Sequence, residues 1–303
     1  MVVAVVMMRE AGHAARPLAH AAGQGESRPL ANHSRLCLDI SRTFVRYIVQ
    51  PHQQPPEPRP TRFARPPLPL WELTLTEAHD ITPHMRRLTF AAAGLNAFDH
   101  RPGQDLVLMM DNPGGEPLRR HYTVRDRTAD SLTIDFVLHG HGGPAERWAI
   151  EARPGDRLEA RGPRGHTSLN PDADWHLFVG DETCLPGIFA MLETLPRSAR
   201  AFAFIEVEDK DDRQYLDAVC DLDLEWLVRD GPALPASLSL IERVALFAPP
   251  PGRGHAYLIG ETSTVQTLRR GLLARGLDKS QITAEGYWRP GRQGGHDHIR
   301  DDG

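Results

Sequence analysis

A short segment of the chain, RRHYTVR from Arg119 to Arg125, combines three arginines with a Tyr-Thr pair in a stretch of β-strand character. An arginine pairs with a phosphate, a tyrosine ring stacks on a flat ring system, and a threonine hydroxyl hydrogen-bonds to the edge of such a ring. A phosphorylated planar cofactor needs all three groups. An exposed edge strand, whose charges discourage aggregation, is the alternative that this segment leaves open.

A glycine-rich loop follows the next predicted strand, in the sequence HGHGGPAERW from His139 to Trp148. Glycines let the backbone come close to a ligand, and the free N–H groups of a helix that begins near Pro144 favour a diphosphate. A plain connection between strand and helix is the alternative. Trp148, one turn into the helix, can be a core residue or a wall for an aromatic ligand.

A third polar segment, GDET from Gly180 to Thr183, ends an apolar strand and leads into a helix. Open α/β sheets bind their ligands at this position. The segment is not G-x-G-x-x-G, and Asp181 or Thr183 can equally serve as a helix cap. Cys184 is expected to be a small buried residue and not a nucleophile, because the motif offers no histidine to activate it.

The overall charge argues against a polyanionic partner. The chain has 35 basic and 40 acidic residues and a formal charge of −5, so we expect no nucleic-acid partner and only a local basic site. The three cysteines are scattered, without zinc-like spacing, which favours a reducing cytoplasm over a disulfide scaffold. The apolar run Val2–Met8 is too short to span a bilayer, and no other stretch approaches that length, so no membrane insertion is expected.

Two histidine pairs are candidates for metal ligands. His139 and His141 flank a glycine at a strand end, and His296 and His298 lie in the polar sequence GGHDHIRDDG. Neither spacing is typical of a metal site, so the sequence predicts none. No Ser-His-Asp or paired-carboxylate arrangement is evident, and no catalytic side chain is assigned.

The hydrophobic pattern predicts two folded domains that position these segments. Residues 70–168 show period-2 alternation in six short strands with turns between them, which indicates an antiparallel β-barrel interrupted by one helix. Residues 169–292 alternate continuous apolar strands with helical segments, which indicates a parallel sheet covered on both faces. Residues 1–69 are predicted to be a proline-rich, weakly structured extension, with a conceivable short helix near residues 34–50, and residues 293–303 a polar tail.

Five segments together resemble the siderophore-interacting protein family, flavin-dependent ferric-siderophore reductases of the ferredoxin-reductase-like superfamily. The segments are RRHYTVR, DFVLHGHGGPAERWA, RPGDRLEARGPRG, LFVGDETCLPGI and GYWRPGR, in the family's order over about residues 70–292. The resemblance implies a six-stranded FAD-binding barrel followed by an α/β domain of the nicotinamide-nucleotide type. One departure is Glu146, where relatives often carry a small residue, because a carboxylate beside a diphosphate is repelled unless it points away.

The resemblance also implies the positions of the cofactor contacts. Arg120 corresponds to a diphosphate contact, Tyr122 and Thr123 to contacts of the isoalloxazine, and Trp288 to an aromatic residue near the flavin. The complete set of implied cofactor residues is Arg120, Tyr122, Thr123, Val124, Arg125, His139, Gly142, Gly143, Pro144, Ala145, Trp148, Gly180, Asp181, Glu182, Thr183 and Trp288. Arg289 and Arg292, just after GYW, are candidates for binding an anionic substrate, although a solvated basic segment explains them equally well.

The implied function is transfer of electrons from NADPH, NADH or ferredoxin through FAD to an iron(III) siderophore. A hydride carries two electrons and iron(III) accepts one, and a flavin can take two and pass them on singly. Two alternatives stay open: a flavin reductase or other oxidoreductase of the same fold, and a flavin-loaded siderophore carrier without its own donor site. A cytoplasmic monomer is expected.

Overall fold

The barrel is an antiparallel sheet that curls on itself at the start of the described part of the chain. The computed structural model describes residues 67–292 and 294–299, so the predicted extension and its conceivable helix lie outside the described residues. The strands are β1 (Leu70–Thr82), β2 (Met85–Ala91), β3 (Asp105–Met110), β4 (Leu118–Thr123), β5 (Asp126–Arg127), β6 (Leu132–Val137) and β7 (Arg157–Arg164). They pair in the order β4-β3-β7-β1-β2-β6-β5.

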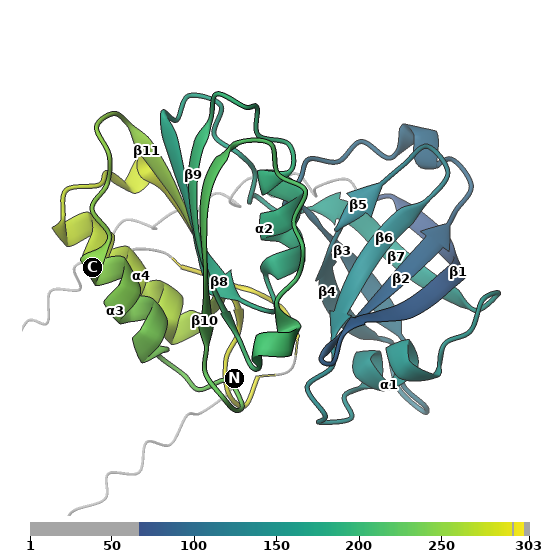
Figure 1. The fold of residues 1–303 in the computed structure, drawn as a ribbon. Coiled ribbons are helices and arrows are strands. Elements are labelled where there is room, and N and C mark those ends of the chain that lie inside the picture. Colours follow the sequence, from purple (N-terminus) through teal and green to yellow (C-terminus); the bar gives the residue numbers. More distant parts are fainter. Residues whose placement is uncertain (1–66, 293, 300–303) are drawn as a thin grey trace, which may run out of the picture. The chain divides into compact units, whose positions relative to one another are not determined.

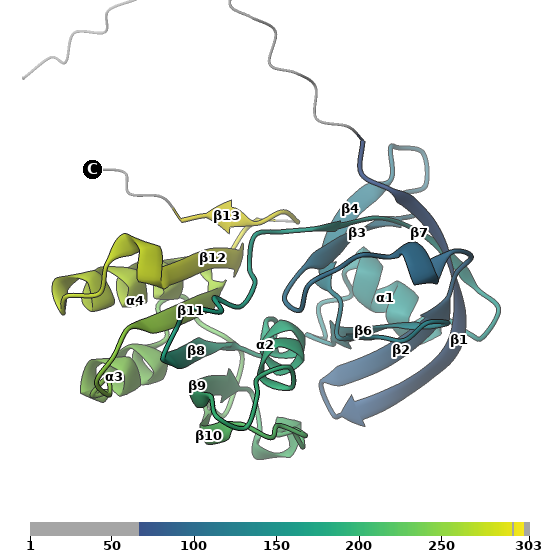
Figure 2. The same cartoon turned by 90° about the horizontal axis from the view of Figure 1, so that it is seen from above.

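The alternation of side chains explains the barrel core. Leu73 and Leu75 of β1 are fully buried, as are Leu88 and Phe90 of the neighbouring β2, while the residues between them point outward. The helix α1 (Pro144–Glu151) packs at one end of the barrel, as Figures 1 and 2 show. The six predicted strands are present, with β5 as an additional two-residue strand.

The second half of the chain forms a mixed sheet with five parallel strands. Its strands are β8 (Trp175–Asp181), β9 (Arg200–Val207), β10 (Asp221–Val228), β11 (Gly254–Glu261), β12 (Ile282–Trp288) and β13 (Asp297–His298). The order is β10-β9-β8-β11-β12-β13, and only β13 pairs antiparallel, against β12. All seven residues of the central β8 are buried, as expected for a parallel strand covered on both faces. The predicted combination of antiparallel barrel and parallel α/β domain is confirmed.

Helices cover both faces of this sheet. The helix α2 (Leu185–Leu192) lies on the face toward the barrel, while α3 (Leu238–Leu246) and α4 (Thr262–Ala274) lie on the opposite face (Figures 1 and 2). Short 3-10 turns, η1 (Leu95–Ala97), η2 (Lys210–Asp212) and η3 (Lys279–Gln281), complete the connections. None of the helices in the described part of the chain has the length and apolar character that a membrane crossing requires.

Two polar contacts join the barrel to the α/β domain. Arg125, just after β4, donates two hydrogen bonds of 2.7 and 2.6 Å to the carboxylate of Glu193 at the end of α2. His84, in the turn between β1 and β2, lies 2.8 Å through Nδ1 from Oδ2 of Asp212. Both pairs lie in one compact unit of the chain.

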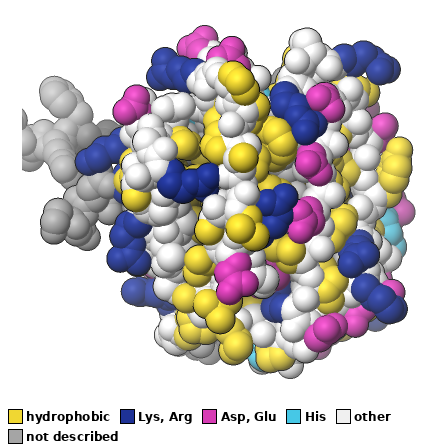
Figure 3. Space-filling model, turned by 60° about the vertical axis from the view of Figure 1, so that its left-hand side comes forward, with side chains coloured by type: hydrophobic (Ala, Val, Ile, Leu, Met, Phe, Trp, Pro, Cys, Tyr) yellow, Lys and Arg dark blue, Asp and Glu magenta, His cyan; other side chains and the backbone are white. Residues whose placement is uncertain are grey.

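Charges of both signs are interspersed on the face that Figure 3 shows, without an extended field of one sign. This pattern agrees with the expectation from the composition that any basic site is local.

Candidate functional site

A cleft of about 410 Å³ opens between the barrel and the carboxyl edge of the parallel sheet. One wall comes from β4, the end of β6 and the loop into α1, and the other from the start of α2, the end of β12 and the C-terminal segment. The lining residues are Arg120, His121, Tyr122, Thr123, Asp135, Val137, His139, His141, Gly143, Pro144, Ala145, Glu146, Thr183, Pro186, Tyr287, Trp288, Arg292, Gly294, Gly295 and His296. Most of the residues singled out in RRHYTVR and in the glycine-rich loop therefore meet in one place.

Strand β4 contributes four consecutive residues to this cleft, from Arg120 to Thr123. The ring of Tyr122 packs on Phe136 of β6, with ring centroids 4.2 Å apart and planes at 32°. Burial raises the pKa of the Tyr122 phenol, so the ring is neutral at physiological pH. Thr123 is buried against α2, where a Cβ added to Gly187 would come within 3.1 Å of its methyl group. The strand thus presents an arginine beside an aromatic ring that the barrel core holds in place.

Arg120 is half-buried and has no carboxylate within ion-pair distance among residues 67–292 and 294–299. Its Nη1 donates a hydrogen bond of 3.0 Å to the carbonyl of Arg119. Gly294 passes close above it with φ +73°, and a Cβ there would lie 2.9 Å from that carbonyl and 3.1 Å from Nη1. A guanidinium at a cleft wall without a compensating carboxylate is suited to an anionic ligand.

The carboxylate of Glu146 points back into the glycine-rich loop. It accepts hydrogen bonds of 2.6 Å from the N–H of Gly140 and 2.9 Å from the N–H of Gly142. The repulsion expected between this carboxylate and a diphosphate is therefore reduced, because the charge is turned toward backbone donors. The helix α1 starts directly after the loop with Pro144 in its first turn, and no side chain caps it. Its first N–H groups remain available to an anion.

On the opposite wall, Asp181 at the end of β8 binds Trp288 at the end of β12. The indole Nε1–H of Trp288 donates a hydrogen bond of 2.9 Å to Oδ2 of Asp181, which also accepts from the N–H of Glu261 at 3.1 Å. The other oxygen, Oδ1, accepts from the N–H of Thr183 at 2.9 Å. Burial, and secondarily the neighbouring Glu182, raises the pKa of Asp181 to about 6, so the group is a carboxylate at neutral pH. Asp181 itself does not line the cleft.

Two further residues of the GDET segment serve the fold of this turn. A Cβ on Gly180 would come within 2.1 Å of Cys184 Sγ and 2.5 Å of the carbonyl of Ile259, so the close approach of strand and helix requires glycine. Glu182 pairs with Arg229 through two hydrogen bonds of 2.7 and 2.5 Å. Of the four residues, Thr183 alone is among those that line the cleft. Cys184 is fully buried, as the sequence predicted.

Several residues proposed as cofactor or substrate contacts lie outside the cleft lining. Val124 is fully buried in the barrel core. Arg125 pairs with Glu193. Trp148 packs on Phe90 and Phe136 behind the cleft wall. Gly142, whose N–H is bound by Glu146, and Arg289, which lies 3.4 Å from Asp297, also lie outside the lining, as do Gly180, Asp181 and Glu182.

Sequence reasoning missed several residues of the cleft. Tyr287 directly precedes Trp288 in GYW, and a search for a second aromatic wall could have found it. His121 directly precedes Tyr122 on β4, and the alternation of side chains along a strand predicts that it points to the other face. His296 comes from the segment expected to be a polar tail, where β13 instead pairs with β12, and no local pattern predicted that it would reach the cleft.

The residues of the cleft fit FAD. A flat ring system can pack against Tyr122, Tyr287 and Trp288, which line the cleft. A diphosphate can bind to the guanidinium of Arg120, which lacks a carboxylate partner among the described residues, and to the uncapped start of α1. The structure therefore supplies an aromatic surface and an anion-binding edge within one cleft.

An antiparallel barrel and a parallel α/β domain that share one cleft define the class of ferredoxin-reductase-like flavoproteins. Residues 109–167 match the siderophore-interacting FAD-binding domain, and residues 173–291 match the siderophore-interacting protein family. The chain belongs to the siderophore-interacting protein family, as the resemblance of the five segments implied.

Named relatives span most of the described chain. A ferric vibriobactin reductase of Vibrio cholerae is 34% identical over 207 residues, 66% of this chain and 74% of that protein. An NADPH-dependent ferric-chelate reductase of Escherichia coli is 30% identical over 254 residues, 76% of this chain and 97% of that protein. The crystal structure of a siderophore utilization protein from T. fusca superposes with a TM-score of 0.70 at 34% identity, covering 77% of this chain and 97% of that one.

Proposed function

We propose that the protein is a ferric-siderophore reductase that passes electrons from NADPH, NADH or ferredoxin through FAD to iron(III) held by a siderophore. The observation that carries this proposal is the single cleft, into which the FAD-binding features of the barrel and the carboxyl edge of the α/β domain both open. The predicted class, a FAD-dependent oxidoreductase, is confirmed by the match to the FAD-binding domain and by relatives that are named ferric reductases.

FAD supplies the conversion between two-electron and one-electron transfer when it is bound. The chain's own residues bind and orient it: Arg120 and the start of α1 would hold the diphosphate, and Tyr122 would lie against the ring. His139, Gly143, Pro144 and Ala145 line the same wall and are proposed as further contacts. Trp288, held by Asp181, would close the other side and exclude water from the ring.

Iron is released because reduction changes its preferred ligands. Siderophores hold iron(III) through hard oxygen donors, and the lower charge of iron(II) weakens these bonds. The reaction needs no proton transfer by a side chain to the iron, so we assign no acid or base residue.

Arg292 and Arg289 remain our candidates for contacts with an anionic siderophore. Arg292 lines the cleft. Arg289 lies nearby in the sequence, and its side chain is 55% exposed. Both arginines pair with Asp297, which compensates part of their charge. An incoming carboxylate or catecholate would have to compete with Asp297 for them.

The charges at the carboxyl edge of the parallel sheet affect which electron donor can bind there. Asp181, Glu182 and Glu206 are buried there, and the charge of Arg229 is already compensated by Glu182. Such an edge offers little attraction to the 2′-phosphate that distinguishes NADPH from NADH. The E. coli relative is named for NADPH, so the donor test includes NADPH, NADH and a reduced ferredoxin.

We propose that the protein acts as a monomer, because both walls of the cleft come from one chain. We also propose a cytoplasmic location, where released iron(II) would be used and NADPH is available.

The decisive test mixes FAD-loaded protein anaerobically with a donor, a ferric siderophore and a chromophoric iron(II) chelator. We expect bleaching of the flavin by NADPH or NADH, followed by reoxidation and formation of the iron(II) complex when siderophore is added. Bleaching without iron(II) indicates another acceptor. If reduced ferredoxin bleaches the flavin and neither nucleotide does, a nicotinamide nucleotide is not the donor, but the reductase function stands. A protein that fails to take up FAD contradicts the proposal altogether.

A further inference from the structure

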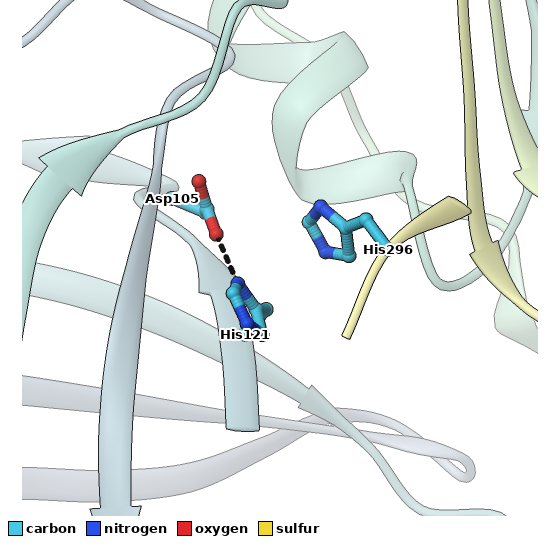
Figure 4. A group of neighbouring side chains, drawn as sticks. All are labelled: Asp105, His121 and His296. Atoms are coloured by element: carbon cyan, nitrogen blue, oxygen red, sulfur yellow. Dashed lines mark hydrogen bonds and ion pairs between the residues drawn. The ribbon is translucent and has the colours of Figure 1, made fainter. Parts of the chain in front are cut away.

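Three side chains from distant parts of the chain converge beside the cleft. Asp105 comes from β3, His121 from β4 and His296 from the segment before β13, and Figure 4 shows them facing one another. Each can offer one ligand atom, and these three atoms all lie within 4.8 Å of one another. The side chains are only 4%, 9% and 8% exposed, in the order named. Polar groups so strongly buried need partners.

Neighbouring groups already orient two of the three ligands. Arg164 Nε lies 3.7 Å from Oδ1 of Asp105, which leaves Oδ2 directed toward His121. Glu285 Oε2 lies 3.5 Å from Nδ1 of His296, which leaves Nε2 of that ring free to bind. The ring of His296 is also stacked on Tyr287, with centroids 4.4 Å apart and planes at 12°. A carboxylate behind a histidine, with the ring held in place, is the usual surrounding of a metal-ligating imidazole.

The Asp105–His121 hydrogen bond is the contact that a metal would replace. Nδ1 of His121 lies 2.7 Å from Oδ2 of Asp105, and this separation also suits two neighbouring ligands of one ion. Binding would displace the proton that the pair shares, which goes to solvent. His296 lies across from the pair, its ring centroid 4.6 Å from that of His121.

Two imidazoles and one carboxylate are a donor set for a divalent transition metal. Iron(III) favours the hard oxygen donors of siderophores, whereas iron(II) accepts imidazole nitrogen together with a carboxylate and leaves positions open for other ligands. His121 and His296 both line the cleft, so the cluster faces the space in which the proposed reduction would produce iron(II).

We propose that Asp105, His121 and His296 form a binding site for a divalent transition metal that receives iron(II) as it leaves the siderophore; the identity of the ion rests on the proposed reductase function. The site gives the product a protein ligand set, so that iron(II) need not pass directly from siderophore to water. The sequence-based expectation of no metal site considered spacing within single segments, and these three residues lie in three segments that only the fold brings together.

Metal binding can be measured without any reductase turnover. The FAD-loaded full-length protein is titrated anaerobically with Co(II), a spectroscopic substitute for iron(II), and binding is followed by EPR and by absorption at wavelengths beyond the flavin bands. We expect one Co(II) bound per chain with a signal characteristic of nitrogen ligation. Replacing both histidines, His121→Ala with His296→Ala, should abolish this signal, and Asp105→Asn should weaken binding by at least about 10-fold.

A matched control is His79→Ala, which removes an exposed histidine of β1 that pairs only with Glu77 among the described residues. This variant should bind Co(II) like the unmodified protein. Glu285→Gln tests the orienting carboxylate and should weaken Co(II) binding about 10- to 100-fold at an unchanged melting temperature. Retained flavin absorbance and thermal melting show that each variant is folded. The absence of stoichiometric Co(II) binding, or equal binding by the double histidine variant, overturns the site.

A second experiment separates this proposal from the reductase function. After one turnover with ferric siderophore, the mixture is passed through an anaerobic desalting column without chelator, and iron(II) is measured in the protein fraction. We expect iron(II) to elute with the unmodified protein and with the small molecules for the double histidine variant. If iron(II) forms in full but is never retained by the protein, the proposed iron(II)-binding site is contradicted and the proposed reductase function stands. If no iron(II) forms, the proposed function fails, while the Co(II) result still decides whether the metal site exists.

Discussion

The indole N–H of Trp288 donates a hydrogen bond of 2.9 Å to Oδ2 of Asp181, across 107 positions of the chain. The bond connects the end of β12 to the end of β8, where the strand order of the sheet changes direction. Asp181 does not line the cleft and Trp288 does, so the carboxylate acts on the cleft only through the ring that it holds.

Asp181→Asn should therefore impair electron transfer without loss of FAD. The carboxylate accepts hydrogen bonds at both oxygens, whereas asparagine has one acceptor oxygen and an amide that faces a donor on the other side. We expect the rate of flavin-dependent iron reduction to fall about 10-fold, equivalent to about 1.4 kcal/mol. Stopped-flow reduction and reoxidation of the flavin measure it. In a Trp288→Phe background the additional effect of Asp181→Asn should be small, and fully additive effects would contradict the positioning role.

The same carboxyl group should make stability depend on pH. Burial raises the pKa of Asp181 from 3.8 to about 6, so the folded protein holds this proton more tightly than the unfolded chain. Its contribution to stability is full below about pH 4 and is lost as pH rises through about 6, by roughly 3 kcal/mol at 1.36 kcal/mol per pKa unit. Urea unfolding measures the free energy of unfolding of the unmodified protein and of Asp181→Asn. The unmodified protein should lose stability relative to the variant between about pH 4.5 and 6.5, and the difference between the two free energies should then stay constant. A constant difference over that range would show that the pKa is not raised.

Arg120 and Tyr122 should control FAD occupancy. Arg120→Ala removes a guanidinium at the cleft wall, and Tyr122→Ala removes the ring that rests on Phe136. A hydrogen bond to a charged group contributes about 1.5–3 kcal/mol, so FAD should dissociate about 10- to 100-fold more readily from Arg120→Ala. Fluorescence titration of the apoprotein with FAD gives these constants. Arg119→Ala is the matched control, because this neighbouring side chain is exposed and only its carbonyl contacts Arg120. An equal loss of FAD affinity in all three variants would support the alternative, in which the segment is a charged edge strand without a cofactor contact.

The hydrophobic pattern predicted much of the fold because the two sheets bury their strands differently. Every residue of β8 is buried, and α2 is buried along its whole length, so this strand and helix read as continuous apolar runs. β1 instead alternates Leu73 and Leu75 with outward residues. These two patterns distinguish a doubly covered parallel sheet from a barrel without knowledge of any contact.

The cleft was predictable only where it follows local chemistry. Arg120, Tyr122 and the loop before α1 carry their signal within a few residues. The bond from Trp288 to Asp181 and the approach of His296 to His121 join segments more than a hundred positions apart, and no periodicity encodes such pairs. Arg125 is a different case, since the family resemblance implies a cofactor contact and its side chain pairs with Glu193, a contact that no local pattern predicts.

Arg125→Ala should reduce stability and leave FAD affinity within about 2-fold. The guanidinium is 10% exposed and makes two hydrogen bonds to Glu193, whose side chain is 26% exposed. Because water partly solvates the carboxylate that is left behind, we expect a loss of about 1–3 kcal/mol. Urea unfolding gives the stability, and FAD titration of the same sample gives the affinity. Glu193→Gln should cost less, because Asp135 remains 4.0 Å from Arg125 Nε. A large loss of FAD affinity from Arg125→Ala would restore the cofactor contact that the family resemblance implies.

The second contact between the two sheets, His84 with Asp212, should be strongest in mildly acidic solution. The hydrogen bond to Asp212 raises the pKa of His84 above 6.5, and the pKa of Asp212 is lowered because its hydrogen bond to His84 and the charge of His84 act against the effect of burial. The contribution of His84 is full below pH 6.5 and is lost as pH rises through its raised pKa, whereas that of Asp212 is lost as pH falls through its lowered pKa. Because the His84 side chain is 38% exposed, we expect at most about 1 kcal/mol. His84→Ala should therefore destabilise the protein more at about pH 5.5 than at about pH 8.5 in urea unfolding, while His79→Ala on the surface of β1 provides the comparison. A deficit that is the same at both pH values would show that the contact is structural and that the charge of His84 contributes nothing to it.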